Sequence, residues 1–95
     1  MSSPDLLAVV AALIPLTFIV NWLIETLKDP DPGVRRSALK ALAAFPEVPE
    51  TTSAMVEAVD DKDVSVSYMA ARLLHDRTGK NGIERTRKAW AEALK

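Results

Sequence analysis

The chain has 95 residues, of which 48% are hydrophobic and 26% are charged, which is typical of one globular domain. It contains no cysteine, so disulfide frameworks, cysteine-based zinc sites and thiol catalysis are excluded, and we expect a cytoplasmic location. A net charge of −1 provides no general field that would attract nucleic acid, although residues 47–63 carry six acids and one base while residues 72–95 carry seven bases and three acids.

The first quarter of the chain is strongly apolar. Residues 6–24 contain no charge, and a run of about 18 or more apolar residues is long enough to be considered as a membrane span. However, Pro15 would break or kink a continuous helix, and Asn21 would place an unpaired amide in hydrocarbon. We therefore predict two short helices at 4–14 and 16–28, with a membrane anchor at residues 6–24 as the alternative.

The first of these helices is apolar almost all round its axis, and such a helix requires burial on all sides. A terminal helix of a small stack can bury only one side. We therefore expect its free side to meet a second copy of the chain, giving a homodimer, with a partner protein, lipid or further repeats as alternatives. The residues predicted to form this self-association surface are Leu6, Leu7, Val9, Val10, Leu13 and Ile14.

The strongest signal is an internal repeat with a period of 32 residues, which aligns residues 23–42 with residues 55–74. The matching pairs are Glu25 and Glu57, Asp29 and Asp61, Asp31 and Asp63, Val34 and Val66, Ala38 and Ala70, and Leu42 and Leu74. Each unit is predicted to fold as helix, tight turn and helix. We expect one domain over residues 1–95, made of a degenerate leading helix at 4–15, repeat 1 at 16–46, repeat 2 at 48–79 and a capping helix at 82–95.

The helices after the first turn are predicted at 32–45, 48–60 and 64–77. Asp31 and Asp63 are the expected N-caps, and Pro32 occupies the first helical position, which favours proline. Gly79 suits a left-handed C-terminal position. The 3.6-residue period predicts two buried stripes: Val34, Ala38, Ala41, Leu42 and Phe45 in the first unit, and Val66, Ala70, Leu73 and Leu74 in the second.

The chain ends with a predicted helix at 82–94, in which Ile83, Trp90 and Leu94 recur at spacings of seven and four. Solenoid proteins need their open ends covered, so we interpret this helix as a cap. Its basic residues Arg85, Arg87 and Lys88 are expected to face water.

The segment LKDPDPGVRRSALKAL resembles the bacterial HEAT-like repeat of the phycobilisome-lyase type, whose consensus runs L-x-D-x-D-x-x-V-R-x-x-A-x-x-A-L. The resemblance implies an all-α fold, a short right-handed α-solenoid of about six helices in HEAT-like hairpins with a C-terminal capping helix. In this family the motif arginine, here Arg35, ties to the aspartates of its own turn, here Asp29 and Asp31. Ser67 replaces that arginine in the second unit, which predicts a less well tied second turn.

Members of this repeat class are mostly scaffolds and adaptors, and no residue of this chain matches a lyase or glycosylase site of the larger relatives. The residues themselves offer little chemistry. His75 is the only histidine, and its neighbour Asp76 would not face it on a helix. Asp60, Asp61 and Asp63 lack the calcium-loop pattern, and no phosphate-binding glycine loop occurs. We therefore predict a protein that is not an enzyme, with no catalytic residue, metal site or cofactor.

Binding is better supported. The period of 32 places Arg36, Lys40, Tyr68, Arg72 and His75 on one surface. This basic strip with one aromatic suits an acidic peptide or a phosphate-bearing ligand, unless it is an ordinary solvated surface, and nucleic acid would usually need more phosphate contacts. The sequence thus favours a protein-interaction scaffold. The alternatives are a membrane-tethered adaptor, and a small-molecule binder or engineered enzyme with an apolar pocket near Phe18, Trp22 and Tyr68.

Overall fold

The computed structural model describes residues 15–95, and this part of the chain forms five helices and no strand: α2 (Leu16–Thr26), α3 (Pro32–Leu42), α4 (Pro49–Ala58), α5 (Val64–Thr78) and α6 (Arg87–Ala93). The all-α class is therefore confirmed. The first of the six predicted helices, at 4–14 with its proposed self-association residues, lies outside the described residues.

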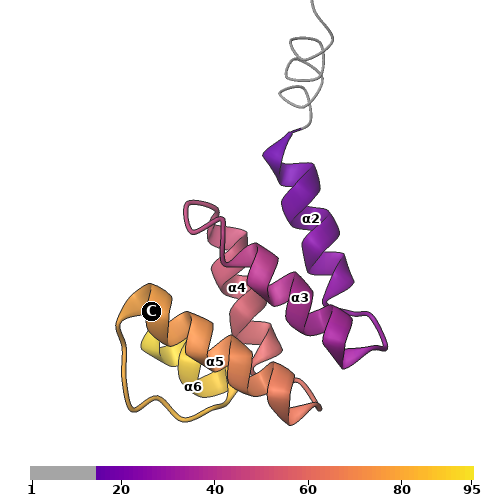
Figure 1. The fold of residues 1–95 in the computed structure, drawn as a ribbon. Coiled ribbons are helices and arrows are strands. Elements are labelled where there is room, and N and C mark those ends of the chain that lie inside the picture. Colours follow the sequence, from indigo (N-terminus) through magenta and orange to yellow (C-terminus); the bar gives the residue numbers. More distant parts are fainter. Residues whose placement is uncertain (1–14) are drawn as a thin grey trace, which may run out of the picture.

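The helices stack in two layers (Figure 1). Helices α2 and α3 form one hairpin, and α4 and α5 form the next. Between the hairpins, α2 contacts α4 and α3 contacts α5, while α6 packs on α4. The first layer therefore contains α2, α4 and α6, and the second contains α3 and α5. Helix α6 occupies the place of the first helix of a third unit.

The two turns inside the hairpins contain the same two kinds of hydrogen bond between an aspartate carboxylate and a backbone amide. In the first turn the Asp29 carboxylate accepts a hydrogen bond from the Asp31 amide at 2.8 Å, and the same bond joins Asp61 and Asp63 at 2.8 Å. Asp31 and Asp63 then accept bonds from the amides two residues later, at 2.7 and 2.9 Å. Both side chains cap the helix that follows, as the sequence predicts.

The start of α2 follows the prediction for the apolar first quarter. Pro15 has extended backbone angles and is the residue before the first helical turn. Within residues 15–95, no helix combines the length and the hydropathy that crossing a bilayer requires. Residues 6–14 of the anchor alternative at residues 6–24 lie outside the described residues.

The C-terminal helix is shorter than predicted. The expected helix at 82–94 begins only at Arg87, because Gly82 adopts a left-handed φ of 71° and Thr86 caps α6 by accepting a bond from the Ala89 amide at 3.1 Å. Ile83 therefore lies in the loop before α6 rather than on its face, although it still packs against the core.

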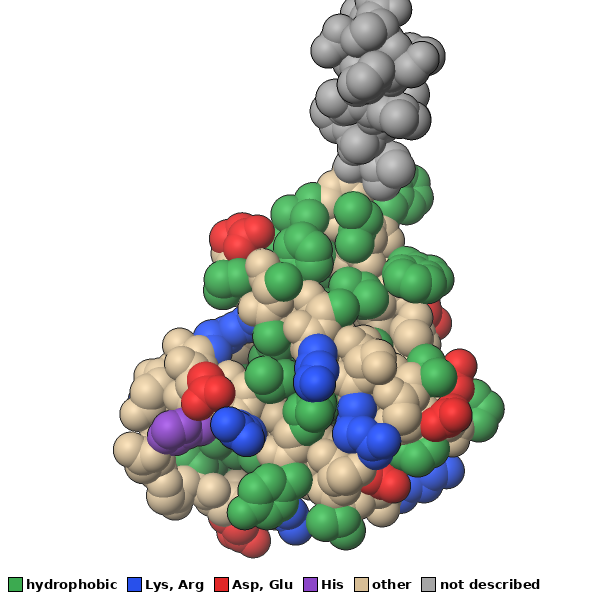
Figure 2. All heavy atoms as spheres, viewed as in Figure 1, with side chains coloured by type: hydrophobic (Ala, Val, Ile, Leu, Met, Phe, Trp, Pro, Cys, Tyr) green, Lys and Arg blue, Asp and Glu red, His purple; other side chains and the backbone are tan. Residues whose placement is uncertain are grey.

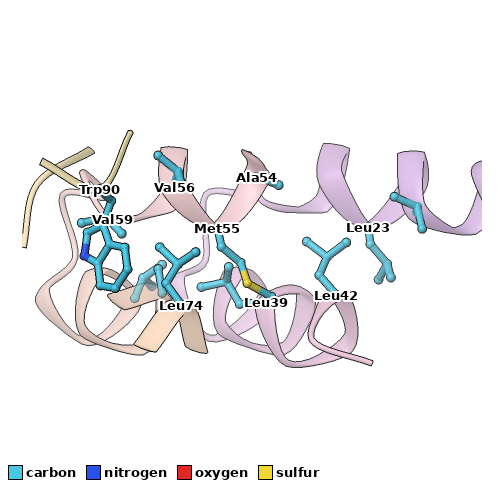
Figure 3. Packing of buried hydrophobic residues seen from close by; sticks show 12 residues of the cluster. Leu23, Leu39, Leu42, Ala54, Met55, Val56, Val59, Leu74 and Trp90 are labelled. Atoms are coloured by element: carbon cyan, nitrogen blue, oxygen red, sulfur yellow. The ribbon is translucent and has the colours of Figure 1, made fainter. Parts of the chain in front are cut away.

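The core runs between the two layers (Figure 3). It consists of Val20, Leu23, Leu39, Leu42, Ala54, Met55, Val56, Val59, Val66, Ala70, Leu74 and Trp90. Figure 3 shows Leu39 in the middle of this cluster with Met55 and Leu74.

The predicted stripe of α3 is partly wrong. Ala38 and Leu42 are buried, but Val34 is 36% exposed and Leu39 is fully buried instead. Helix α3 ends at Leu42, so Phe45 lies beyond it, and Phe45 is only half-buried. Helix α3 has neighbours on two sides, α2 and α5, whereas a single stripe describes contact on one side. The stripe of α5 is confirmed at Val66, Ala70 and Leu74, and Leu73 is half-buried.

Candidate binding surface and cavity

Arg35 positions the two units relative to each other. Its side chain is buried, and it donates to the Asp61 carboxylate from Nε at 2.9 Å and from Nη2 at 3.1 Å. Its Nη1 donates to the backbone oxygens of Asp29 and Pro30 at 2.7 and 3.0 Å. The expected tie to Asp29 is therefore present, through its backbone oxygen, but the expected tie to Asp31 is replaced by one to Asp61. Stacking brings the turn of the next unit alongside α3, so the carboxylate partner comes from that turn.

Ser67 fills the position of the second motif arginine. It is buried, and its hydroxyl donates to the Val59 carbonyl at 2.6 Å. The second turn is further held by Asp60, which accepts a bond from the Arg87 amide at 2.8 Å. The prediction of a less well tied second turn is wrong, because Arg35, Ser67 and α6 all bind it.

The five residues of the predicted strip lie on α3 and α5, which are neighbours in one layer. Figure 2 shows lysine and arginine side chains on this face. Arg36 donates to the Ser65 hydroxyl at 2.6 Å and lies 3.9 Å from Asp63 Oδ1, so it also links the units. Lys40 and Arg72 are exposed, and within residues 15–95 their side chains donate no hydrogen bond. These two are the free cations of the strip.

His75 has a partner that the helical period does not predict. Its Nδ1 lies 3.3 Å from Asp76 Oδ1, and both side chains are exposed. The expectation that these neighbours would not face each other is wrong, because exposed side chains at the surface of a helix have room to turn toward one another.

A cavity of about 480 Å³ lies between α5, the loop after it and α6. Its walls are Tyr68, Ala71, Arg72 and His75 of α5, Lys80, Asn81, Gly82, Ile83 and Arg85 of the loop, and Trp90 of α6. The α5 residues follow the spacing of one helical face. Sequence reasoning found three of them as part of the strip. It missed the loop residues. The signal for this loop in the sequence is the pair of glycines at 79 and 82, both of which adopt positive φ.

The wall of the cavity contains a cation–π pair and a buried tryptophan. Arg85 is exposed, as predicted, and its guanidinium carbon lies 4.9 Å from the centre of the Tyr68 ring, a cation–π geometry. Trp90 is 3% exposed, and its Nε1 donates to no atom of the described residues. Buried polar atoms usually have a partner, and this indole N–H is an exception among the described residues.

The acidic residues of the second turn have structural roles. Asp61 binds Arg35, Asp63 caps α5, and Asp60 binds the first amide of α6. The Ser65 hydroxyl first, and then the Val66 amide, hold the pKa of the Asp63 carboxyl below its ordinary value. Among residues 15–95, no group of three carboxylate or imidazole side chains is placed to hold a metal ion.

An apolar pocket was expected near Phe18, Trp22 and Tyr68. Tyr68 lines the cavity described above, but Phe18 and Trp22 do not. Both are 68% exposed on α2. With Leu16 and Ile19 they form an exposed apolar face, and Figure 2 shows hydrophobic side chains gathered over this helix.

Two hairpins stacked through equivalent helices, with an arginine of one unit bound to the turn of the next, define a helical-repeat protein. The family model described as HEAT repeats matches residues 20–95, and the chain belongs to this family. Comparison with curated proteins and with solved structures gives no match. The phycobilisome-lyase type of repeat stays a prediction.

Proposed function

We propose that this protein is a scaffold module that binds an acidic segment of a partner protein on the face formed by α3 and α5. HEAT repeats generally mediate contacts between proteins. The observation that supports this face is the position of Lys40 and Arg72, equivalent residues of two stacked helices whose charges have no acidic partner among residues 15–95. Basic groups arranged in this way favour and orient an acidic partner.

The contrast with the other charges supports this choice. Arg35 is used in joining the units and Arg87 contacts Glu57 and Asp60. The acidic residues of the turns are likewise used in caps and pairs. Lys62, Lys80 and Lys88 are also exposed and without an acidic partner among residues 15–95, but Lys40 and Arg72 are the pair that repeats at equivalent positions on the neighbouring helices α3 and α5.

A labelled polyglutamate peptide tests this proposal by fluorescence anisotropy at low salt. The double variant Lys40→Glu, Arg72→Glu should bind it about tenfold or more weakly, since two attractive charges become repulsive. The control carries Lys62→Glu and Lys88→Glu, which change the net charge equally at exposed positions away from the face. Equal loss in both proteins, or no loss in the first, would rule the face out. Arg36→Glu can be added as a third substitution on the same face, but it also removes the hydrogen bond from Arg36 to Ser65.

A second candidate function is self-association at the N-terminal end of the stack. The exposed apolar face of α2 supports it, because contiguous apolar surface on a protein marks an interaction site. This face would act together with the predicted surface Leu6–Ile14. Light scattering after size-exclusion chromatography tests it: the full chain should show a concentration-dependent mass, and Phe18→Glu with Trp22→Glu should leave a monomer. A monomer at all concentrations without the substitutions would exclude this candidate.

A further inference from the structure

The cavity lies beside α5, on the side that corresponds, by the 32-residue repeat, to the side of α3 that faces the next unit. In the first unit, the side of α3 that faces the next unit is covered by α5, and Leu39 there is fully buried. A shift of 32 residues places Leu39 on Ala71 of α5. Helix α6 packs on α4 and takes the place of a first helix, but no described second helix follows beside α5. Only the loop and Trp90 cover this side, and they leave the cavity open.

The walls of the cavity separate into an apolar floor and a cationic rim. Ala71, Ile83 and Trp90 are at least half-buried. Arg72, Lys80 and Arg85 are exposed. None of the ten lining residues is acidic. The acids beside them are Asp76, which pairs with His75, and Glu84, which lies in the chain between Ile83 and Arg85. The cavity therefore favours an anion that also carries an apolar body.

The guanidinium groups of the cationic rim suit a planar anion. Arg85 is held over the Tyr68 ring, so less side-chain freedom is lost when it binds. A guanidinium recognises carboxylate oxygens through paired N–H groups. The Trp90 ring contributes apolar surface on the floor side.

We propose that this cavity binds an apolar carboxylate, with its apolar body against Ala71, Ile83 and Trp90 and its carboxylate between Arg72 and Arg85. A volume of about 480 Å³ lies within the range of roughly 300–1,000 Å³ found for ligand pockets. In the partner, this group is an apolar side chain next to a glutamate or aspartate. That source rests on the proposed function, whereas the chemistry of the cavity stands on the geometry alone.

The first test titrates the full chain with 3-phenylpropionate and follows the indole N–H signals by NMR. The chain has two tryptophans, and they form a matched pair: Trp90 lines the cavity, and Trp22 is exposed on α2. The Trp90 signal should shift and saturate while the Trp22 signal stays in place. Propionate lacks the apolar body and 3-phenylpropan-1-ol lacks the charge, so each should bind about tenfold or more weakly. Equal binding of either probe, or equal shifts of both tryptophans, would overturn the proposal.

Variants locate the carboxylate. Arg85→Ala should weaken 3-phenylpropionate binding about fivefold or more, because an exposed charge-assisted contact is lost. Lys88→Ala removes the same charge from the surface of α6 without touching the cavity and should bind as the original protein does. Unchanged binding by Arg85→Ala would contradict the proposed site.

Competition separates this inference from the proposed function. Polyglutamate has no apolar side chain, so its binding tests the charged face alone, and 3-phenylpropionate tests the cavity alone. A peptide with phenylalanine beside glutamate should displace 3-phenylpropionate, and its alanine counterpart should not. If 3-phenylpropionate binds but polyglutamate does not, the cavity stands and the charged face falls. If neither peptide displaces 3-phenylpropionate, the partner segment as the source of the carboxylate is wrong.

Discussion

The Arg35 guanidinium donates two hydrogen bonds to the Asp61 carboxylate, at 2.9 and 3.1 Å, across the boundary between the two repeat units. Both side chains are largely buried, with 6% and 12% of their surfaces exposed. Two further bonds from Arg35 to carbonyls of its own turn complete its surroundings. This pair therefore joins the first hairpin to the second at the place where both turns meet.

Arg35→Ala should lower the free energy of unfolding by about 3 kcal/mol, because the Asp61 carboxylate loses its charged partner while largely buried. Urea denaturation of the full chain measures the loss. Lys28→Ala is the matched control: it breaks an ion pair with Glu25 at 3.3 Å whose side chains are 73% and 69% exposed. Such a pair contributes about 0–1 kcal/mol. Equal effects of the two substitutions would contradict the role assigned to Arg35.

Leu39→Ala should cost about 2–5 kcal/mol of stability, as expected for a fully buried leucine whose removal leaves a cavity. Val34→Ala, five residues earlier on the same helix, should cost much less because Val34 is 36% exposed. Thermal or urea unfolding of both variants compares them directly. The opposite order would show that α3 buries the side that its sequence period suggests.

Asp63 should make stability depend on pH under acidic conditions. The Ser65 hydroxyl and the Val66 amide lower the pKa of its carboxyl from 3.8, so folding favours the charged form. The stabilisation is present above the unfolded value of 3.8 and is lost as the pH falls through the lower folded value. Asp63→Asn can still cap α5 but does not titrate. The stability difference between the two proteins, measured by urea unfolding, should therefore shrink below about pH 4; a constant difference would contradict it.

Gly79→Ala should destabilise the protein by about 1 kcal/mol. Gly79 has a φ of 73° after α5, and the Cβ of an alanine makes this left-handed backbone conformation less favourable. No atom outside its chain neighbours lies within 4 Å of an added Cβ, so backbone strain alone accounts for the effect. Gly79→Asn is the control, since asparagine tolerates this conformation. It should melt closer to the original protein than Gly79→Ala does.

Sequence by itself determined the features that depend on neighbours along the chain. Asp31 and Asp63 cap helices because their carboxylates accept bonds from amides two residues later. Gly79 ends α5 because it adopts positive φ without strain. The period of 32 residues indicated two equivalent hairpins, since the same turn chemistry occurs twice. These effects act over a few residues, and the order of side chains is enough to predict them.

Tertiary structure decided which surface each helix meets. Arg35 reaches Asp61 rather than the carboxylates of its own turn, because the second unit stacks beside α3. Arg77 contacts Thr51 at 2.7 Å and the carbonyls of Leu42 and Ala43 at 3.3 Å, bonds that join segments far apart in the chain. The cavity likewise depends on α6 packing on α4 and leaving one side of α5 to the loop. A repeat in the sequence predicts units with similar structures. The side chains that each residue contacts across the boundary depend on how one unit packs on the next, and that packing involves the whole stack.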